Sequence, residues 1–333
     1  MASSSRAPTS SIGQNSRPEA SNHERPDGHP AFAGQTIIIA ADEGLGDMIQ
    51  FVRYVPMVAA LGARVILAVQ EPLLPLLSNM PGISQCVPVA EASDLAGVDV
   101  QCPIMSLSLA FRTTLATIPA QVSYLPAPDP DRIQLWQERL GTPKKLRIGL
   151  VWSGNPNHLD DHNRSIPLRM FSCLLREDAA FISLQKEPTA EDKAVLQEAS
   201  GIVDLSGQLA DFADTAALIS CLDLVITVDT SVAHLAGALG CPTWTLLSYT
   251  PDYRWLLDRD DSVWYPRMRL SRQRERRDWR EVIDQVGDAL RQRIVARASS
   301  PPVSSDDRVI LRRFNSTTGG LPSVAGGNVR RPS

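Results

Sequence analysis

The sequence predicts an α/β protein with two parallel β-sheets, each covered by helices. Short runs of aliphatic residues alternate along the chain with segments whose apolar residues recur at helical spacing. This alternation occurs twice, with first strands around Ile37 and Ile148. Strands that alternate with helices form parallel sheets. We therefore expect two Rossmann-like domains that face one another across a cleft, with ligands at the carboxyl ends of the strands.

The first series contains two strands and two helices. Residues 35–41 are rich in isoleucine and predict a strand, and residues 47–62 have helical spacing and end on Gly62. Residues 64–70 predict the next strand, and residues 72–82 a short helix that starts at a proline, followed by a turn.

The second series follows a predicted helix and linker at residues 129–145. Its predicted strands are residues 146–152, 180–185, 223–228 and 242–248, and its predicted helices are residues 169–177, 190–200, 212–222 and 231–240. We place the amino-terminal domain at residues 35–140 and the carboxyl-terminal domain at residues 141–297. Residues 1–34 and 298–333 are poor in large apolar residues, which predicts two disordered tails.

Composition narrows the class of protein. The chain has 333 residues, of which 43% are hydrophobic and 21% charged, as is typical of soluble globular proteins. The net charge of −4 gives no support to a nucleic-acid partner. No apolar run reaches the roughly 20 residues of a transmembrane helix, and the first 30 residues lack the apolar core of a secretory signal. We therefore expect a cytoplasmic protein without a transmembrane segment.

The loop after the first strand presents a carboxylate. Gly44 and Gly46 precede Asp47, which stands at the start of the predicted helix. A dinucleotide fingerprint would need a small residue where Ile49 stands, and a phosphate-binding P-loop would need a lysine. We interpret the loop as a turn, bent at its two glycines, that directs Asp47 into the cleft.

A second candidate site follows the strand at residues 223–228. Asp229 lies at the strand end, Thr230 and Ser231 begin a helix, and His234 lies about one turn further on. A helix start offers unpaired N–H groups and a positive dipole end, which suit a diphosphate. The same residue types also serve as ordinary helix caps, and a single helical histidine is often structural. Spacing alone leaves both alternatives open.

The polar loop at residues 153–168 adds further candidates at the same edge of the sheet. Arg164 beside a hydroxyl is a candidate phosphate clamp, because guanidinium groups match phosphate oxygens. The spacing of histidines and aspartates in this loop argues against a metal site. The candidate donor contacts from this loop and from the end of the next strand are Ser153, Asn155, Arg164, Ser165, Gln185 and Lys186.

The arginine-rich run at residues 267–282 is interpreted as a solvated helix start and not as a nucleic-acid site, since its only aromatic residue is Trp279. Asp278 and Glu281 have the spacing of a capping box for the last helix.

Two blocks of the chain resemble the heptosyltransferase-like glycosyltransferases of family 9. The first is "GLGDMIQFVRYVPMVAALG" and the second is "DLVITVDTSVAHLAGALGCPTWTLLSYTPDYRW". The second block reproduces the family pattern at Asp229, Thr230, Ser231, His234, Leu235, Ala238 and Pro242. The resemblance covers residues 36–290 and is strongest to the glycosyltransferase domain of bacterial tetratricopeptide-repeat proteins, although no such repeat is visible here.

This resemblance implies the GT-B fold, a nucleotide-sugar donor in the carboxyl-terminal domain and an acceptor in the amino-terminal domain. Asp47 would be the general base, and Arg164, with Lys186, would neutralise the leaving diphosphate, so that neither a metal nor a cofactor is needed. The expected activity is inverting, metal-independent sugar transfer to a glycan of lipopolysaccharide type or to a protein. Peripheral membrane association and a tetratricopeptide-repeat partner chain stay open.

Two alternatives remain. The protein could be a catalytically silent module that binds a nucleotide-sugar, or an NAD-dependent oxidoreductase. The role of Asp47 separates the first from a transferase, and nicotinamide binding identifies the second.

Overall fold

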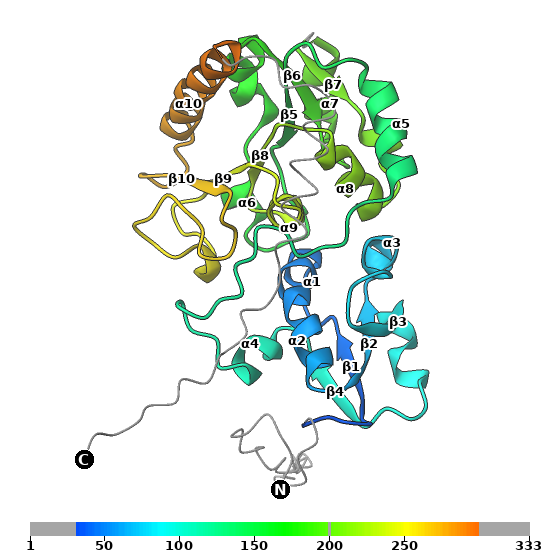
Figure 1. Ribbon diagram of the computed structural model, residues 1–333. Helices are drawn as coiled ribbons and strands as arrows, with labels where there is room; N and C mark the ends of the chain where they lie inside the picture. Colours follow the sequence, from blue (N-terminus) through cyan, green and yellow to red (C-terminus); the bar gives the residue numbers. More distant parts are fainter. Residues whose placement is uncertain (1–30, 199–200, 300–333) are drawn as a thin grey trace, which may run out of the picture.

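The computed structural model describes residues 31–198 and 201–299, which form two parallel sheets with helices packed against them (Figure 1). The predicted tails, apart from a few residues at their inner ends, lie outside the described residues. The α/β prediction with two parallel sheets is confirmed.

The first sheet has the strand order β3-β2-β1-β4, and every pair is parallel. Its strands are β1 (Thr36–Ala40), β2 (Arg64–Val69), β3 (Ile83–Pro88) and β4 (Val100–Pro103). Alternate residues of β1 enter two different hydrophobic clusters, with Ile37 and Ile39 in one and Ile38 and Ala40 in the other. Because both faces of β1 are buried, its sequence is a continuous apolar run.

The second sheet has the order β10-β9-β8-β5-β6-β7 and is also parallel throughout. Its strands are β5 (Leu146–Val151), β6 (Ala179–Ser183), β7 (Ile202–Asp204), β8 (Leu224–Val228), β9 (Thr243–Leu247) and β10 (Met268–Arg272). The central strands β5 and β8 are buried along their whole length.

Helices connect the strands in both series. In the amino-terminal part these are α1 (Leu45–Phe51), η1 (Val52–Tyr54), α2 (Val55–Ala60), η2 (Glu71–Leu73), α3 (Leu74–Leu77), η3 (Val89–Asp94) and α4 (Ser106–Ala110). In the carboxyl-terminal part they are α5 (Pro130–Leu140), α6 (Asp161–Arg164), η4 (Leu168–Arg176), α7 (Ala190–Glu198), η5 (Ser206–Gln208), α8 (Phe212–Ser220), α9 (Ser231–Ala238), η6 (Tyr253–Trp255) and α10 (Arg280–Ala298). Figure 1 shows α5 beside α8, at the edge of the second sheet.

Four local predictions were wrong. The first series contains four strands and not two, because β3 and β4 lie at the two edges of its sheet and were not predicted. The segment 47–62 is not one helix, because the 3₁₀ turn η1 interrupts it and α2 restarts with Pro56 in its first turn. The arginine-rich run contains strand β10, since Met268 and Leu270 are buried within an otherwise charged sequence. The predicted capping box is absent, because Asp278 accepts a hydrogen bond from the backbone of Arg280 and Glu281 pairs with Arg274.

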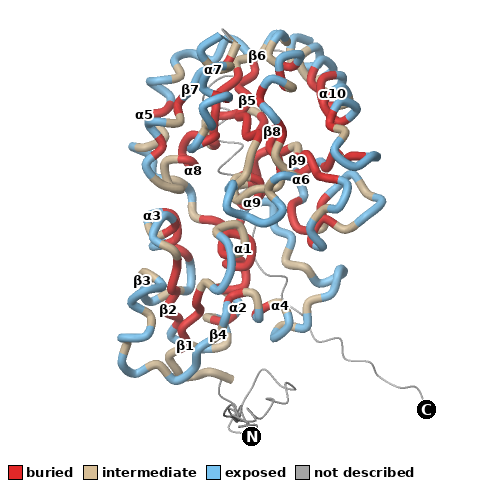
Figure 2. Tube along the Cα trace, turned by 180° about the vertical axis from the view of Figure 1, so that it is seen from behind, coloured by how far each residue is buried: buried red, intermediate tan, exposed pale blue. Residues whose placement is uncertain are grey.

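The two domains touch along α1 and α9. One hydrophobic cluster contains Ile49 and Phe51 from the first domain and Leu235, Trp264 and Tyr265 from the second. Figure 2 shows the buried part of α1 directly below α9.

Arg53 strengthens this contact from within. Its side chain is buried and donates to the carbonyl oxygens of Gln50 and Trp264 and to the hydroxyl of Tyr124. The guanidinium also lies 4.9 Å from the ring centroid of Tyr265. A charged group thus bonds both domains at once, and cation–π contacts supplement its hydrogen bonds.

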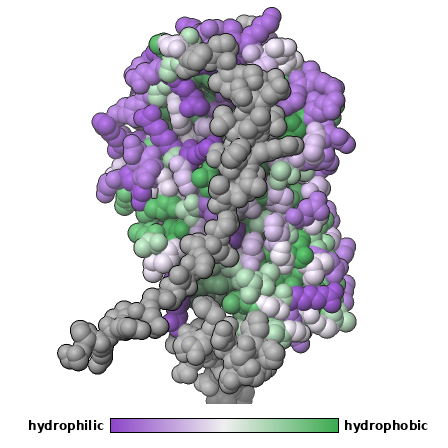
Figure 3. Space-filling view, viewed as in Figure 1, coloured by the Kyte–Doolittle hydropathy of each residue, from purple (hydrophilic) through white to green (hydrophobic). Residues whose placement is uncertain are grey.

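The visible surfaces of the two domains differ. Hydrophilic residues dominate the upper, carboxyl-terminal domain, whereas hydrophobic residues are more frequent over the lower domain (Figure 3). None of the described helices combines the length and the apolarity that a membrane-spanning helix requires.

Candidate functional site

The two sequence-predicted loops meet at the contact between α1 and α9. A β-carbon placed on Gly46 would lie 2.8 Å from Cδ2 of His234 and 3.5 Å from Cα of Ser231. Both helices begin at the carboxyl end of a parallel strand, as predicted for a ligand site. The structure therefore brings Asp47 close to the start of α9.

The glycines of the first loop serve a different purpose from the predicted bend. The backbone of Gly44 has a φ of −72°, and neither glycine is among those with positive φ. Gly46 is needed because the neighbouring helix leaves no room for a side chain. The close approach of the helices, and not an unusual backbone conformation, explains this glycine.

Asp47 is held at both of its oxygens. Oδ2 accepts a hydrogen bond of 2.9 Å from the backbone N–H of Gly44, and Oδ1 lies 2.7 Å from Nη2 of Arg254. Its side chain is 18% exposed. A carboxylate has about four lone-pair positions, so two remain for a further partner such as an acceptor hydroxyl.

Asp229 and His234 are organised by Trp255, which sequence reasoning missed. The indole N–H of Trp255 donates to Oδ2 of Asp229 at 2.8 Å, and its ring stacks on that of His234 with centroids 5.3 Å apart. Burial raises the pKa of Asp229, while the hydrogen bond from Trp255 and the charge of Arg254 act in the opposite direction.

His234 is neutral in this environment. Its ring is buried, and Nδ1 lies 2.8 Å from the hydroxyl of Tyr265. Burial lowers the pKa of His234 well below its ordinary value, and the nearby charges of Arg254, Arg53 and Arg164 lower it further. The ring can therefore exchange a hydrogen bond but does not carry a charge near neutral pH.

The start of α9 lacks a side-chain cap. Thr230 is the residue that precedes the helix, yet its side chain makes no capping hydrogen bond, and its hydroxyl lies 3.3 Å from that of Thr227. The alternative that Asp229 and Thr230 merely cap this helix is therefore not supported by their contacts.

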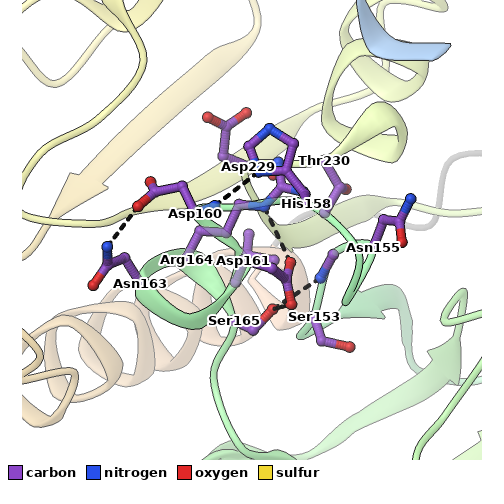
Figure 4. Close-up of polar contacts among 12 residues, drawn as sticks. Ser153, Asn155, His158, Asp160, Asp161, Asn163, Arg164, Ser165, Asp229 and Thr230 are labelled. Atoms are coloured by element: carbon purple, nitrogen blue, oxygen red, sulfur yellow. Dashed lines mark hydrogen bonds and ion pairs between the residues drawn. The ribbon is translucent and has the colours of Figure 1, made fainter. Parts of the chain in front are cut away.

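Arg164 lies beside the same strand end, as Figure 4 shows. Its Nη1 donates to the carbonyl oxygen of Asp229 at 3.1 Å, and its Nε bonds Asp161 at 3.2 Å. Asp161 also accepts from the hydroxyl of Ser165, which in turn accepts from the backbone of Gly154. The polar loop is thus folded around its own arginine, which holds that cation against the end of β8.

The remaining predicted donor residues differ in their placement. Gln185 is buried, and its Oε1 accepts from the backbone N–H of Ser153 at 3.1 Å. Asn155 is exposed and accepts from the backbone of Asn157, and Lys186 is exposed and donates to the carbonyl of Ala210. These hydrogen bonds do not connect Asn155 or Lys186 to Asp229, so the roles of both residues at the donor site stay predictions.

In the part of the chain that the structure describes, no group of three or more His, Cys, Asp or Glu side chains could hold a metal ion.

The fold matches that of solved GT-B heptosyltransferase structures, although their sequence identity to this chain is low. The structure of ADP-heptose LPS heptosyltransferase II from Escherichia coli superposes with a TM-score of 0.54 at 13% identity, covering 80% of this chain and 100% of that one. A family 9 glycosyltransferase from Veillonella parvula gives 0.51 at 12% identity, with 86% and 98% covered. The iron-containing dodecameric glycosyltransferase TibC of E. coli gives 0.51 at 11% identity, with 80% and 76% covered.

Sequence comparison is more specific over part of the chain. Residues 179–281 match the model of glycosyltransferase family 9 (heptosyltransferase). Protein FlbA of Caulobacter vibrioides is 28% identical over 287 residues, which are 78% of this chain and 46% of that protein. The chain thus spans less than half the length of this relative. The segment 179–281 that matches the family model contains Asp229, Thr230, Ser231 and His234.

Proposed function

We propose that the protein is an inverting glycosyltransferase that moves a sugar from a nucleotide-sugar to a glycan or protein acceptor. The observation that carries the proposal is the contact of Gly46 with Ser231 and His234. It brings a carboxylate from one domain close to an uncapped helix start in the other, which is the pairing that such a transfer needs.

The proposed reaction divides the work between the two domains. Asp47 accepts the proton of the acceptor hydroxyl while the acceptor oxygen forms a bond to the anomeric carbon. The bond from that carbon to the diphosphate oxygen breaks, and its electron pair leaves with the diphosphate. The N–H groups at the start of α9 and the guanidinium of Arg164 stabilise the departing charge.

The donor is tested first by binding. A thermal-shift screen of ADP-, UDP-, GDP- and dTDP-linked sugars should reveal one that stabilises the protein, by about 2.7 kcal/mol at 100 times its dissociation constant. NAD should produce no shift, because the match to a glycosyltransferase family favours sugar transfer over hydride transfer.

The role of Asp47 is tested by turnover. Asp47→Asn should lower the rate of donor consumption, with an added acceptor or with water, by about 10²- to 10⁴-fold, because a positioned general base contributes that much. Asp42→Asn is the matched control, since Asp42 is exposed in the same loop. Equal rates for both variants and the parent protein would remove the general-base assignment.

A silent binding module is the second candidate, and the engagement of both Asp47 oxygens favours it. It predicts that the selected nucleotide-sugar binds but is never consumed.

We also propose that transfer is independent of a metal ion. Because TibC is described as iron-containing, this proposal is tested directly. Dialysis against a chelator, followed by metal analysis and an activity measurement, should leave transfer unchanged.

A further inference from the structure

The turn η6 contacts both halves of the candidate site with two successive residues. Arg254 reaches Asp47 in the first domain, and Trp255 donates to Asp229 in the second. Both residues end the second block that resembles family 9, but neither was predicted as a site residue from the sequence. A three-residue turn therefore spans the distance between the candidate base and the donor-side aspartate.

Each nitrogen of the Arg254 guanidinium has a separate partner. Nη2 pairs with Asp47 at 2.7 Å, Nη1 donates to Oε1 of Gln50 at 3.1 Å, and Nε pairs with Asp252 at 2.7 Å. Asp252 also accepts from the backbone N–H of Arg254, which fixes the turn on which the arginine stands. The guanidinium plane is thus set before it meets Asp47.

The environment makes this contact stronger than a surface ion pair. The Arg254 side chain is only 9% exposed, and Gln50 is completely buried. Partial burial reduces the screening of the charges by water. Burial acts to lower the pKa of Arg254, but the charges of Asp47 and Asp252 outweigh it and raise the pKa above its ordinary value.

Trp255 fixes the other end of the turn. Besides its bond to Asp229, it is buried and stacked on His234, and it borders Tyr265 with ring centroids 6.3 Å apart. Trp255 therefore fixes the position of Arg254 relative to Asp229 and His234. Arg254 in turn fixes the position of Asp47 relative to the same two residues.

We infer that Arg254 is a positioning residue for Asp47, and that η6 sets the carboxylate relative to the donor-side aspartate and histidine. This inference rests on the proposed function, because it assigns Asp47 the role of base. Arginine suits the task because its planar fork can serve three acceptors at fixed angles, which a lysine ammonium cannot do.

A kinetic double-mutant cycle tests the inference with the full-length protein. Arg254→Met should lower kcat for donor consumption by about 100-fold, as expected when a reacting group is displaced by about an ångström. The dissociation constant of the nucleotide-sugar should stay within about twofold of the parent value. In the Asp47→Asn background, Arg254→Met should cause little further loss, because both changes act through one carboxylate.

Matched variants exclude a general effect of charge. Arg259→Met removes an arginine from the same loop, where it pairs with exposed Asp261, and should leave kcat and binding unchanged. Arg254→Lys should recover only a small part of the lost kcat. Free guanidinium ion, far below denaturing concentration, should partly restore kcat to Arg254→Ala, whereas urea should not.

Three results would overturn the inference. Losses that multiply in the double variant would show that Arg254 acts independently of Asp47. Weaker donor binding with unchanged kcat would make Arg254 a donor ligand. An unchanged kcat in Arg254→Met would remove its role altogether.

A parent protein that binds donor but consumes none would instead count against the proposed function. In that case the same four proteins are compared by unfolding. A coupling between the two substitutions would support the link from Arg254 to Asp47, and additivity would refute it.

Discussion

Replacing Gly46 with alanine tests the packing of the two domains at the candidate site. The new methyl carbon would lie 2.8 Å from Cδ2 of His234, closer than carbon atoms approach without movement. The imidazole cannot easily give way, because Tyr265 bonds its Nδ1 and Trp255 stacks on its ring. The overlap must therefore push α1 away from α9 or displace the imidazole.

Two opposing effects decide the magnitude. Overpacking in a closely packed region costs about 1–3 kcal/mol. Exchanging glycine for alanine in a helix returns roughly 0.5–1 kcal/mol, since alanine loses less conformational freedom on folding. We therefore expect Gly46→Ala to lower the free energy of unfolding by about 0–2.5 kcal/mol and to reduce donor consumption, because Asp47 moves with α1.

Denaturant unfolding monitored by tryptophan fluorescence gives the change in stability, and donor consumption gives the change in function. Gly207→Ala is the control, because a β-carbon at Gly207 would meet nothing within 4 Å. The reasoning is refuted if Gly46→Ala is as stable as Gly207→Ala and consumes donor at the parent rate.

Three further predictions concern the residues around this contact. Asp229→Asn should stabilise the protein at neutral pH, because burial raises the pKa of Asp229 in the folded state. The carboxyl group therefore contributes its full stabilisation only below its unfolded pKa near 3.8. This contribution is lost as the pH rises through the folded-state pKa. The stability difference from the parent, measured by unfolding from about pH 4 to pH 8, should therefore grow with pH, and a constant difference would contradict it. Trp255→Phe keeps an aromatic ring but leaves Asp229 without its indole donor, which should cost about 1–3 kcal/mol in unfolding experiments; no loss would show that another donor replaces it. Arg53→Lys should cost about 1.5–3 kcal/mol, because an ammonium cannot reach all the oxygens that the guanidinium serves, and a calorimetric scan with an unchanged midpoint would oppose this.

The inner strands of both sheets could be predicted from the sequence because burial on both faces leaves a local signature, whereas the edge strands β3, β4, β7 and β10 were not predicted. The isoleucines of β1 and the apolar run of β8 each read as a buried parallel strand without knowledge of any partner. Strand β10 was missed for the converse reason. It lies at the edge of the sheet, where Met268 and Leu270 are buried, Arg269 is exposed and Arg272 is half-buried, so its sequence resembles a charged helix start.

Only part of the candidate site could be predicted from the sequence. Motifs identify residue types that follow a strand, but they do not identify the residues from distant parts of the chain that contact them. Asp229 stands directly after a strand, and Asp47 and His234 lie in the helices that follow strands, so all three could be named. Arg254 comes 204 positions after Gln50, to which it bonds, and no spacing rule links residues so far apart. The one available signal was a strand end followed by an arginine and a tryptophan, a combination that is compatible with many surface turns.

The same limit explains why Gly46 was interpreted as a bend. A glycine in a loop before a helix is most simply explained by backbone freedom, and the sequence contains nothing that says otherwise. The structure shows ordinary negative φ at Gly44 and a neighbouring helix against Gly46. The requirement for glycine is therefore a property of the domain contact. Since Asp47 is the next residue, the contact that excludes a side chain at Gly46 also fixes where the candidate base can stand.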